Sequence, residues 1–372
     1  MKITDVEAIY VRSEKVRELC DSGQDALIVR VHTDAGISGI GEVDSNPLAA
    51  KGAIEGPYSH SVTCGLRELV LGADPFETEK IWNKMYEGNL YGGRRGAGFH
   101  AMSGIDLALW DIKGKALEMP VWKLLGGGFH QRLRCYASSL WGPTPAATKD
   151  LARRYVDRGF SAVKFGWEPM GQDEATDIAL VREARAGLGE GPDLLIDAGL
   201  VWDAKTAIQR VRAFEEHRIF WLEEPLMPDN YEGYRRLSEA VDTRIAAGEE
   251  ESGRASFIEL MDRGKVDVVQ VDLTRVGGFT EAVKIAALAQ DRGVRVANHG
   301  FTTYINVAAA LHFLNSIPNA LIVEYVAEEE TTLRDHLTKQ RITAQDGLLE
   351  IPQEPGLGVE LDEEAVERFR VL

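Results

Sequence analysis

Three acidic residues lie at regular intervals in the second half of the chain, each at the end of a short apolar run. They are Asp197 in LLIDAG, Glu223 in FWLEE and Glu249 in RIAAGEE, and successive members are 26 residues apart. Adjacent parallel strands lie about 4.8 Å apart, so one β/α unit between successive acids would bring the three carboxylates together. Converging carboxylates repel one another unless a cation lies between them, and an all-oxygen ligand set favours a hard divalent ion. We therefore predict that Asp197, Glu223 and Glu249 bind Mg²⁺.

A second glutamate, Glu224, follows Glu223 directly and precedes a proline. Successive side chains along a strand point to opposite faces, so we expect Glu224 to point outward, where it would pair with a basic residue or cap a helix. A single acid at a strand end is ordinarily a helix cap or a solvated loop residue. The even spacing of three such acids is what favours the metal site.

Asp272 and His299 end the next two apolar runs, DVVQVD and VRVANH, and are therefore expected to be neighbours as well. A carboxylate next to an imidazole orients the ring and raises its basicity. We predict that His299 acts as a general base and that Asp272 supports it. The alternative for His299 alone is a structural histidine whose ring nitrogens are satisfied within the fold.

Short apolar runs alternate with helical patterns from about residue 130 onward. Runs rich in Val, Ile, Leu and Ala are typical of parallel strands covered on both faces, and the segments 203–217 and 279–293 have the pattern of amphipathic helices. This alternation predicts a (β/α) barrel, in which the active site lies at the C-terminal ends of the strands. A doubly wound open sheet is the competing arrangement, although no GxGxxG loop follows the first run. The runs are 134–139, 161–166, 194–199, 220–224, 244–250, 267–272, 294–299 and 320–325.

The first 125 or so residues have a different pattern. The segments 1–13 and 26–43 suggest antiparallel strands, the second of which turns at 34–36, and a helical stretch covers 102–117. We expect an α+β unit in front of the barrel. The last segment, 347–369, is too short to fold alone and is expected to pack back on that unit.

The composition is that of a large acidic protein. The chain has 372 residues, 44% of them hydrophobic, a formal net charge of −17 and three widely spaced cysteines. The negative charge argues against binding to nucleic acid or to an anionic membrane surface. The cysteines form no CxxC or Cys/His cluster, which argues against a disulfide framework or a zinc site. No stretch resembles a signal peptide or approaches the length of a membrane span, so we expect a cytoplasmic protein.

Together, these residues resemble the enolase superfamily and, within it, the mandelate racemase subgroup, along nearly the whole chain. The segments SGIDLALWDIKGKALEMPVWKLLGG and EPGLGVEL are also similar to members of that family. The resemblance implies an α/β fold, a modified (β/α)7β TIM barrel with an N-terminal α+β capping domain. It implies a capping domain at 1–127, a barrel at 128–338 and a C-terminal segment at 339–372 that packs back on the cap.

The resemblance also implies roles for single residues. The metal ligands and the His–Asp dyad of the family correspond to the residues named above, and a glutamate of the eighth strand corresponds to Glu324 in IVEY. Many members carry Lys-x-Lys at the end of the second strand, with the second lysine as a base. Here the stretch is Lys164-Phe165-Gly166, so the second position has no side chain. Lys164 remains, at a position that contacts the substrate carboxylate in related enzymes.

The chemistry implied by the family is removal of a proton α to a carboxylate, with Mg²⁺ stabilising the enediolate that forms. Racemisation needs a proton donor or acceptor on each face of the α-carbon, whereas one histidine suffices for β-elimination. Because Gly166 leaves one face without its usual base, we predict a Mg²⁺-dependent dehydratase of an aldonate or aldarate. His299 would take the α-proton, the β-hydroxyl would leave, and a 2-keto-3-deoxy acid would result. The alternative is a cycloisomerase, epimerase or racemase acting on a sugar acid or its lactone.

Substrate specificity is expected to come from cap segments that close over the barrel mouth. Arg94 or Arg95 could bind a distal carboxylate of the substrate, and an ordinary solvated arginine pair is the alternative. Trp167, near Lys164, packs either on the substrate or on its own loop. The candidate cap segments are 11–23, 44–50 and 91–100.

Two other classes of protein fit parts of the pattern. A barrel aldolase would need a Schiff-base lysine or a different set of metal ligands. Lys164 is the only inward strand-end lysine, and the three evenly spaced acids argue against an aldolase. A catalytically silent binding protein would not need an intact set of acids together with a His–Asp pair. The expected partners are therefore a small-molecule carboxylate substrate and further copies of the chain in a homo-oligomer.

Overall fold

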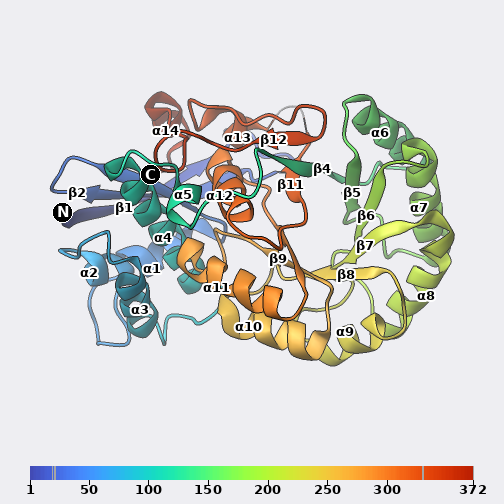
Figure 1. The fold of residues 1–372 in the computed structure, drawn as a ribbon, viewed down its shortest axis with the longest axis horizontal. Helices are drawn as coiled ribbons and strands as arrows, with labels where there is room; N and C mark the ends of the chain where they lie inside the picture. The colour runs from blue at the N-terminus through green and yellow to red at the C-terminus, as the bar shows by residue number, and fades with distance from the viewer. Residues whose placement is uncertain (19, 21, 329–330, 372) are drawn as a thin grey trace.

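The computed structural model describes residues 1–18, 20, 22–328 and 331–371, in which an N-terminal α+β domain lies beside a barrel (Figure 1). The elements of the N-terminal domain are β1 (Ile3–Arg12), β2 (Asp25–Thr33), β3 (Ser38–Val43), α1 (Pro47–Glu55), α2 (Leu66–Val70), α3 (Thr78–Gly88), α4 (Ala97–Ala116) and α5 (Val121–Leu124). The three strands form an antiparallel sheet with β2 in the middle. The turn from β2 to β3 contains Gly36 at φ +75°, a conformation that glycine adopts without steric strain.

Eight parallel strands form the barrel, and a helix follows each of the first seven, which confirms the predicted (β/α)7β fold. The strands are β4 (Arg132–Leu140), β5 (Ala162–Gly166), β6 (Asp193–Asp197), β7 (Ile219–Glu223), β8 (Arg244–Ala247), β9 (Val268–Val271), β10 (Arg295–Asn298) and β11 (Val323–Val326). The helices between them are α6 (Pro145–Asp157), α7 (Glu174–Leu188), α8 (Ala204–Phe214) with a 3₁₀ turn (Glu215–His217), α9 (Tyr231–Ser238), α10 (Gly253–Glu259) with a π turn (Leu260–Gly264), α11 (Gly278–Asp291) and α12 (Tyr304–Asn315).

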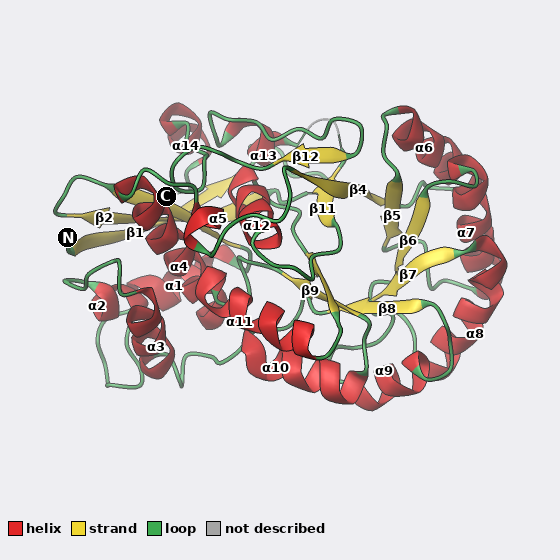
Figure 2. Cartoon of the chain, viewed as in Figure 1, coloured by secondary structure: helices red, strands yellow, loops and turns green. Residues whose placement is uncertain are grey.

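The barrel sheet is nearly closed. Neighbours in sequence pair from β4 to β10, β11 pairs with β4, and a single bridge joins Val296 of β10 to Ala320, just before β11. Helices α6 to α10 lie outside the strands, as Figure 2 shows. The C-terminal ends of all eight strands therefore meet around one opening.

A buried apolar layer fills the barrel and fixes which side chains face inward at the strand ends. Residues two positions apart on a strand share a face, so Asp197, two after Leu195, and Glu223, two after Trp221, also point inward. Lys164 follows Ala162 in the same way. The polar site thus stands on top of this layer, which consists of Tyr136, Ala162, Leu195, Trp221, Ala246, Val268, Ala297 and Ile322.

The C-terminal segment, with α13 (Thr332–His336), β12 (Leu348–Glu350) and α14 (Glu363–Phe369), contacts both domains. Its Leu357 N–H donates to Asp111 of α4 over 2.9 Å, whereas β12 pairs antiparallel with β4 of the barrel. The segment therefore reaches the cap, as expected, and also extends the barrel sheet. The boundaries expected after residues 127 and 338 stay predictions. Within the described part of the chain, every helix is too short or too polar to cross a membrane.

Candidate active site

A cavity of about 320 Å³ lies at the C-terminal ends of the barrel strands. Most of the residues predicted to do chemistry line it. Glu223, which is fully buried, contacts the lining residue Lys164. The lining residues are Cys20, Ser138, Ser139, Leu140, Lys164, Gly166, Trp167, Asp197, Glu249, Glu250, Arg275, His299, Phe301 and Glu324.

The three acids with even spacing converge in this structure. Asp197, Glu223 and Glu249 each offer an oxygen atom that lies within 4.8 Å of the other two, and all three side chains are buried. Asp197 and Glu223 are register partners on β6 and β7, and Glu249 lies two residues beyond the end of β8. Trp221 supports the cluster from below, because its indole Nε1–H donates to Glu223 over 3.0 Å. Whether a metal binds here stays a prediction.

Lys164 is the cation nearest to these carboxylates. Its ammonium nitrogen lies 2.5 Å from Glu223, 2.7 Å from Glu324 and 4.0 Å from Asp197. Burial by itself would lower the pKa of Lys164, but the charges of Glu223 and Glu324 outweigh it, and the pKa lies well above its usual value. Lys164 is therefore held as an ammonium ion at the base of the cavity.

One lysine does not balance the three carboxylates around it. Burial and the charge of Glu223 raise the pKa of Asp197 well above its ordinary value, despite Lys164. Burial likewise raises the pKa of Glu223. The raised pKa values of these two neighbouring carboxyl groups fit a site for a divalent cation, and a donor set made of carboxylate oxygens fits a hard ion such as Mg²⁺.

His299 and Asp272 form a hydrogen-bonded pair on the other side of the cavity. His299 Nδ1 lies 2.7 Å from Asp272 Oδ2, while Nε2 lies 3.4 Å from Glu249. Burial lowers the pKa of His299, but the charges of Glu249 and Asp272 raise it to about 10. The N–H and hydroxyl of Thr274 donate to the other oxygen of Asp272 over 2.7 and 2.5 Å. The pair is therefore held in one orientation with Nε2 directed to the cavity side.

The prediction for Glu224 is wrong. The residue has left the strand and adopts φ +37°, so strand alternation no longer applies to it. Its buried carboxylate accepts from the N–H of Gly248 over 3.2 Å and has an oxygen within 4.8 Å of oxygens of Glu249 and Glu250. Burial and the charge of Glu249 raise the pKa of Glu224 well above its ordinary value. Glu224 thus lies against the acid cluster as a carboxyl group that resists ionisation.

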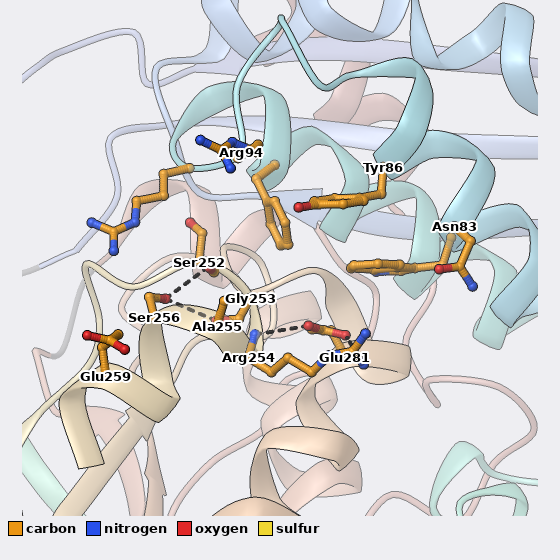
Figure 3. A pocket seen from close by; sticks show the side chains of 13 residues that line it. Asn83, Tyr86, Arg94, Ser252, Gly253, Arg254, Ala255, Ser256, Glu259 and Glu281 are labelled. Atoms are coloured by element: carbon orange, nitrogen blue, oxygen red, sulfur yellow. Dashed lines mark hydrogen bonds and ion pairs between the residues drawn. The ribbon is translucent and has the colours of Figure 1, made fainter. Parts of the chain in front are cut away.

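The prediction that Arg94 or Arg95 reaches the substrate is not supported by their position. Both line a separate cavity of about 670 Å³ between the cap and α10, which Figure 3 shows with Arg94, Tyr86 and Glu281 around it. Arg95 is bound there by Asp229 over 2.8 Å. The loop 91–100 runs toward α10 and away from the described lining of the barrel cavity, which is why the arginines miss it.

Trp167, by contrast, lines the barrel cavity and is 51% exposed. It adopts φ +69°, and its N–H donates to the backbone oxygen of Asp197 over 3.3 Å. The ring is therefore held beside the acid cluster, where a substrate can contact it.

Sequence reasoning missed Arg275, which lines the cavity between the dyad and Glu249. Arg275 lies three residues after Asp272, in the turn between β9 and α11. A basic residue in a turn at the C-terminal ends of barrel strands is a usable signal, because such turns build the active site. Its partner, Asp44, belongs to the cap segment 44–50 that the sequence did point to.

The fold and this arrangement of carboxylates, lysine and dyad define a member of the enolase superfamily. The chain belongs to the mandelate racemase/muconate lactonizing enzyme family. Residues 16–126 match the N-terminal domain of that family, and residues 147–365 match the enolase C-terminal domain-like model. The resemblance drawn from the motifs is thereby confirmed.

Relatives and solved structures give the same placement. A D-galactarolactone cycloisomerase from Agrobacterium fabrum is 33% identical, covering 93% of this chain and 91% of the relative. A D-galactonate dehydratase from Xanthomonas oryzae pv. oryzae is 36% identical, covering 92% and 90%. The crystal structure of the 3,6-anhydro-D-galactonate cycloisomerase from Zobellia galactanivorans superimposes with a TM-score of 0.89 at 32% identity, covering both chains completely. The chain is thus similar to enzymes named for sugar acids or their lactones.

Proposed function

We propose that the protein is a Mg²⁺-dependent dehydratase of a sugar acid, either an aldonate or an aldarate. The observation that carries the proposal is a single His–Asp pair beside three converging carboxylates, with Gly166 where a second base would stand. A base on one face of the α-carbon suffices for elimination, whereas racemisation needs one on each face. The relative named D-galactonate dehydratase supports the substrate class.

In this proposal His299 is the acid–base residue. Its Nδ1 is bound to Asp272, which leaves Nε2 to accept the α-proton. The charge of Glu249 helps to raise the pKa of His299, and a divalent cation bound by Glu249 would offset that charge and favour the neutral ring that acts as the base. The electron pair of the broken C–H bond forms the carbon–carbon double bond as the β-hydroxyl leaves, and the imidazolium returns its proton to that group as water. The enol then tautomerises to a 2-keto-3-deoxy acid, so atoms and charge balance.

Lys164 and the acid cluster bind the carboxylate end of the substrate. The ammonium of Lys164 offers a fixed positive charge to the substrate carboxylate, a preorganised interaction that strengthens as negative charge develops there. A divalent ion held by Asp197, Glu223 and Glu249 would act as a Lewis acid for the same charge. Glu324 lies 2.7 Å from Lys164 and orients the ammonium. The Glu324 carboxylate is itself held by the backbone N–H of Gly300, which donates to it over 2.8 Å.

A cycloisomerase reaction is the second candidate, because a relative and a solved structure carry that name. It would use the same first step, proton transfer at the α-carbon by His299, and would differ in what leaves or closes on the neighbouring carbon. The two candidates differ in their product. Dehydration of an acyclic sugar acid removes one water molecule, whereas isomerisation of a lactone leaves the mass unchanged.

The test is a panel of aldonates, aldarates and aldarolactones with Mg²⁺, analysed by mass spectrometry and by a colour reaction for 2-keto acids. We expect loss of water from at least one acyclic acid, and loss of at least a hundredfold in kcat for His299→Asn. Exposed His60→Asn is the matched control and should keep wild-type activity. Full activity of His299→Asn would show that another residue is the base.

The cytoplasmic location and the homo-oligomeric state expected from the sequence stay predictions. Cell fractionation would test the first, and light scattering the second.

A further inference from the structure

Arg275 connects the cap to two elements of the active site. Its Nε and Nη2 lie 2.9 and 2.7 Å from the same oxygen of Asp44, which follows β3 of the cap. Its Nη1 donates to the backbone oxygen of Glu249 over 3.2 Å and lies 3.7 Å from the Glu249 carboxylate. Its Nε also lies 3.9 Å from Asp272 Oδ2. The mostly buried guanidinium therefore contacts groups from three separate segments.

The shape of the guanidinium explains why arginine stands here. Its planar fork directs Nε and Nη2 to one side and leaves Nη1 for a partner on another side. A lysine would keep the charge but lacks this planar fork, so it cannot reproduce the geometry in which two nitrogens face Asp44 and a third faces Glu249. The backbone N–H of Arg275 also donates to the backbone oxygen of Asp272 over 3.1 Å, so the dyad turn and the arginine are parts of one unit.

We propose that Arg275 is a positioning residue that holds the cap at Asp44 against the barrel mouth and, through the same guanidinium, fixes Glu249 in the place where it can bind metal. The pair Asp44–Arg275 thereby couples closure of the cap to assembly of the metal site. The second half of this inference rests on the proposed function, since it assumes that Glu249 is a metal ligand. The first half depends only on contacts within the protein.

The variants are Arg275→Lys, Asp44→Asn and the double variant. Arg134→Lys is the matched control, because Arg134 makes a comparable set of bonds to Asp193 and Ser161 at the opposite end of the barrel. Hydrogen–deuterium exchange of the metal-free protein should become faster in segments 44–50 and 248–252 of Arg275→Lys, with β1 and β2 unchanged. Calorimetric titration with Mg²⁺ alone should give about tenfold or more weaker binding for each single variant. The double variant should bind no more weakly than the weaker single variant, because both changes break one link.

Wild-type exchange rates in both segments of Arg275→Lys would overturn the proposal, as would fully additive losses of Mg²⁺ affinity. A wild-type protein that binds no Mg²⁺ would instead overturn the metal site of the proposed function. In that case the exchange experiment still decides whether Arg275 holds the cap, so the two failures are distinguishable.

Discussion

Gly166→Ala is predicted to weaken metal binding by displacing Asp197. A β-carbon at Gly166 would lie 2.8 Å from the β-carbon of Asp197 and 3.0 Å from its Oδ2. Ordinary van der Waals contact begins at 3.4 Å, so the side chain of Asp197 has to move by about 0.6 Å. Metal–ligand distances tolerate only about 0.2 Å. We therefore expect Mg²⁺ affinity to fall roughly 10- to 100-fold, which corresponds to about 1.4 to 2.7 kcal/mol.

The assay is calorimetric titration with Mg²⁺, together with urea unfolding to measure stability. Gly52→Ala is the control, because a β-carbon on this residue of α1 would meet nothing within 4 Å. Alanine in that helix should stabilise the protein by up to about 1 kcal/mol and leave Mg²⁺ affinity unchanged. A folded Gly166→Ala protein with wild-type Mg²⁺ affinity would refute the reasoning, since Asp197 would then be either free to move or no ligand.

Two further predictions concern stability and specificity. Burial lowers the pKa of His312 to about 4, and its Nδ1 accepts from Trp122 N–H over 3.3 Å, a bond that protonation would break. The unfolded chain binds this proton more tightly than the folded one, so the contribution of neutral His312 to the free energy of unfolding is fully present above pH 6.5 and is lost between pH 6.5 and 4. The loss amounts to about 2 kcal/mol at pH 5. Urea unfolding of the wild type and of His312→Gln would check this, and an equally steep loss in the variant would contradict it. Trp167→Ala should raise KM for the active sugar acid roughly three- to tenfold, because an aromatic contact with the substrate is lost. Arg95→Ala, in the other cavity, should leave KM unchanged. Steady-state kinetics in which Arg95→Ala had the larger effect would contradict the placement of the substrate in the barrel cavity.

The barrel and the inward-facing acids were predictable because both follow from short-range periodicity. A strand alternates its faces with period two, so the inward direction of Asp197 and Glu223 follows once the strands are recognised. Glu249 could be placed only approximately, since it lies beyond the end of β8, where no such rule holds. Its spacing from Glu223, one β/α unit, carried the prediction instead.

The errors occurred where the backbone leaves regular structure. Glu224 was expected to point outward, but its positive φ turns it toward Glu249. Arg94 and Arg95 were candidates for the barrel mouth because their loop is basic and rich in glycine, with a solvated arginine pair as the alternative. The path of that loop depends on the packing of α3, α4 and α11 and on the cavity that the loop shares with α10, which local sequence does not encode. For the same reason, the contact between Asp44 and Arg275, 231 residues apart, could not be foreseen.

Gly166 also bears on the choice between reactions that the family can catalyse. It pairs in register with Asp197, and the space that a side chain would need at this position is occupied by the Asp197 carboxylate. A second base at 166 is therefore incompatible with Asp197 in its present position, which is also the position that lets the three acids converge. Two acid–base groups with carboxylate partners stand in the described lining of the cavity: Lys164, which Glu223 and Glu324 hold as an ammonium ion, and His299, which is paired with Asp272. His299 is therefore the better base. A site with this geometry is suited to reactions that move one proton on one face of the α-carbon, which includes dehydration and cycloisomerisation and disfavours two-base racemisation.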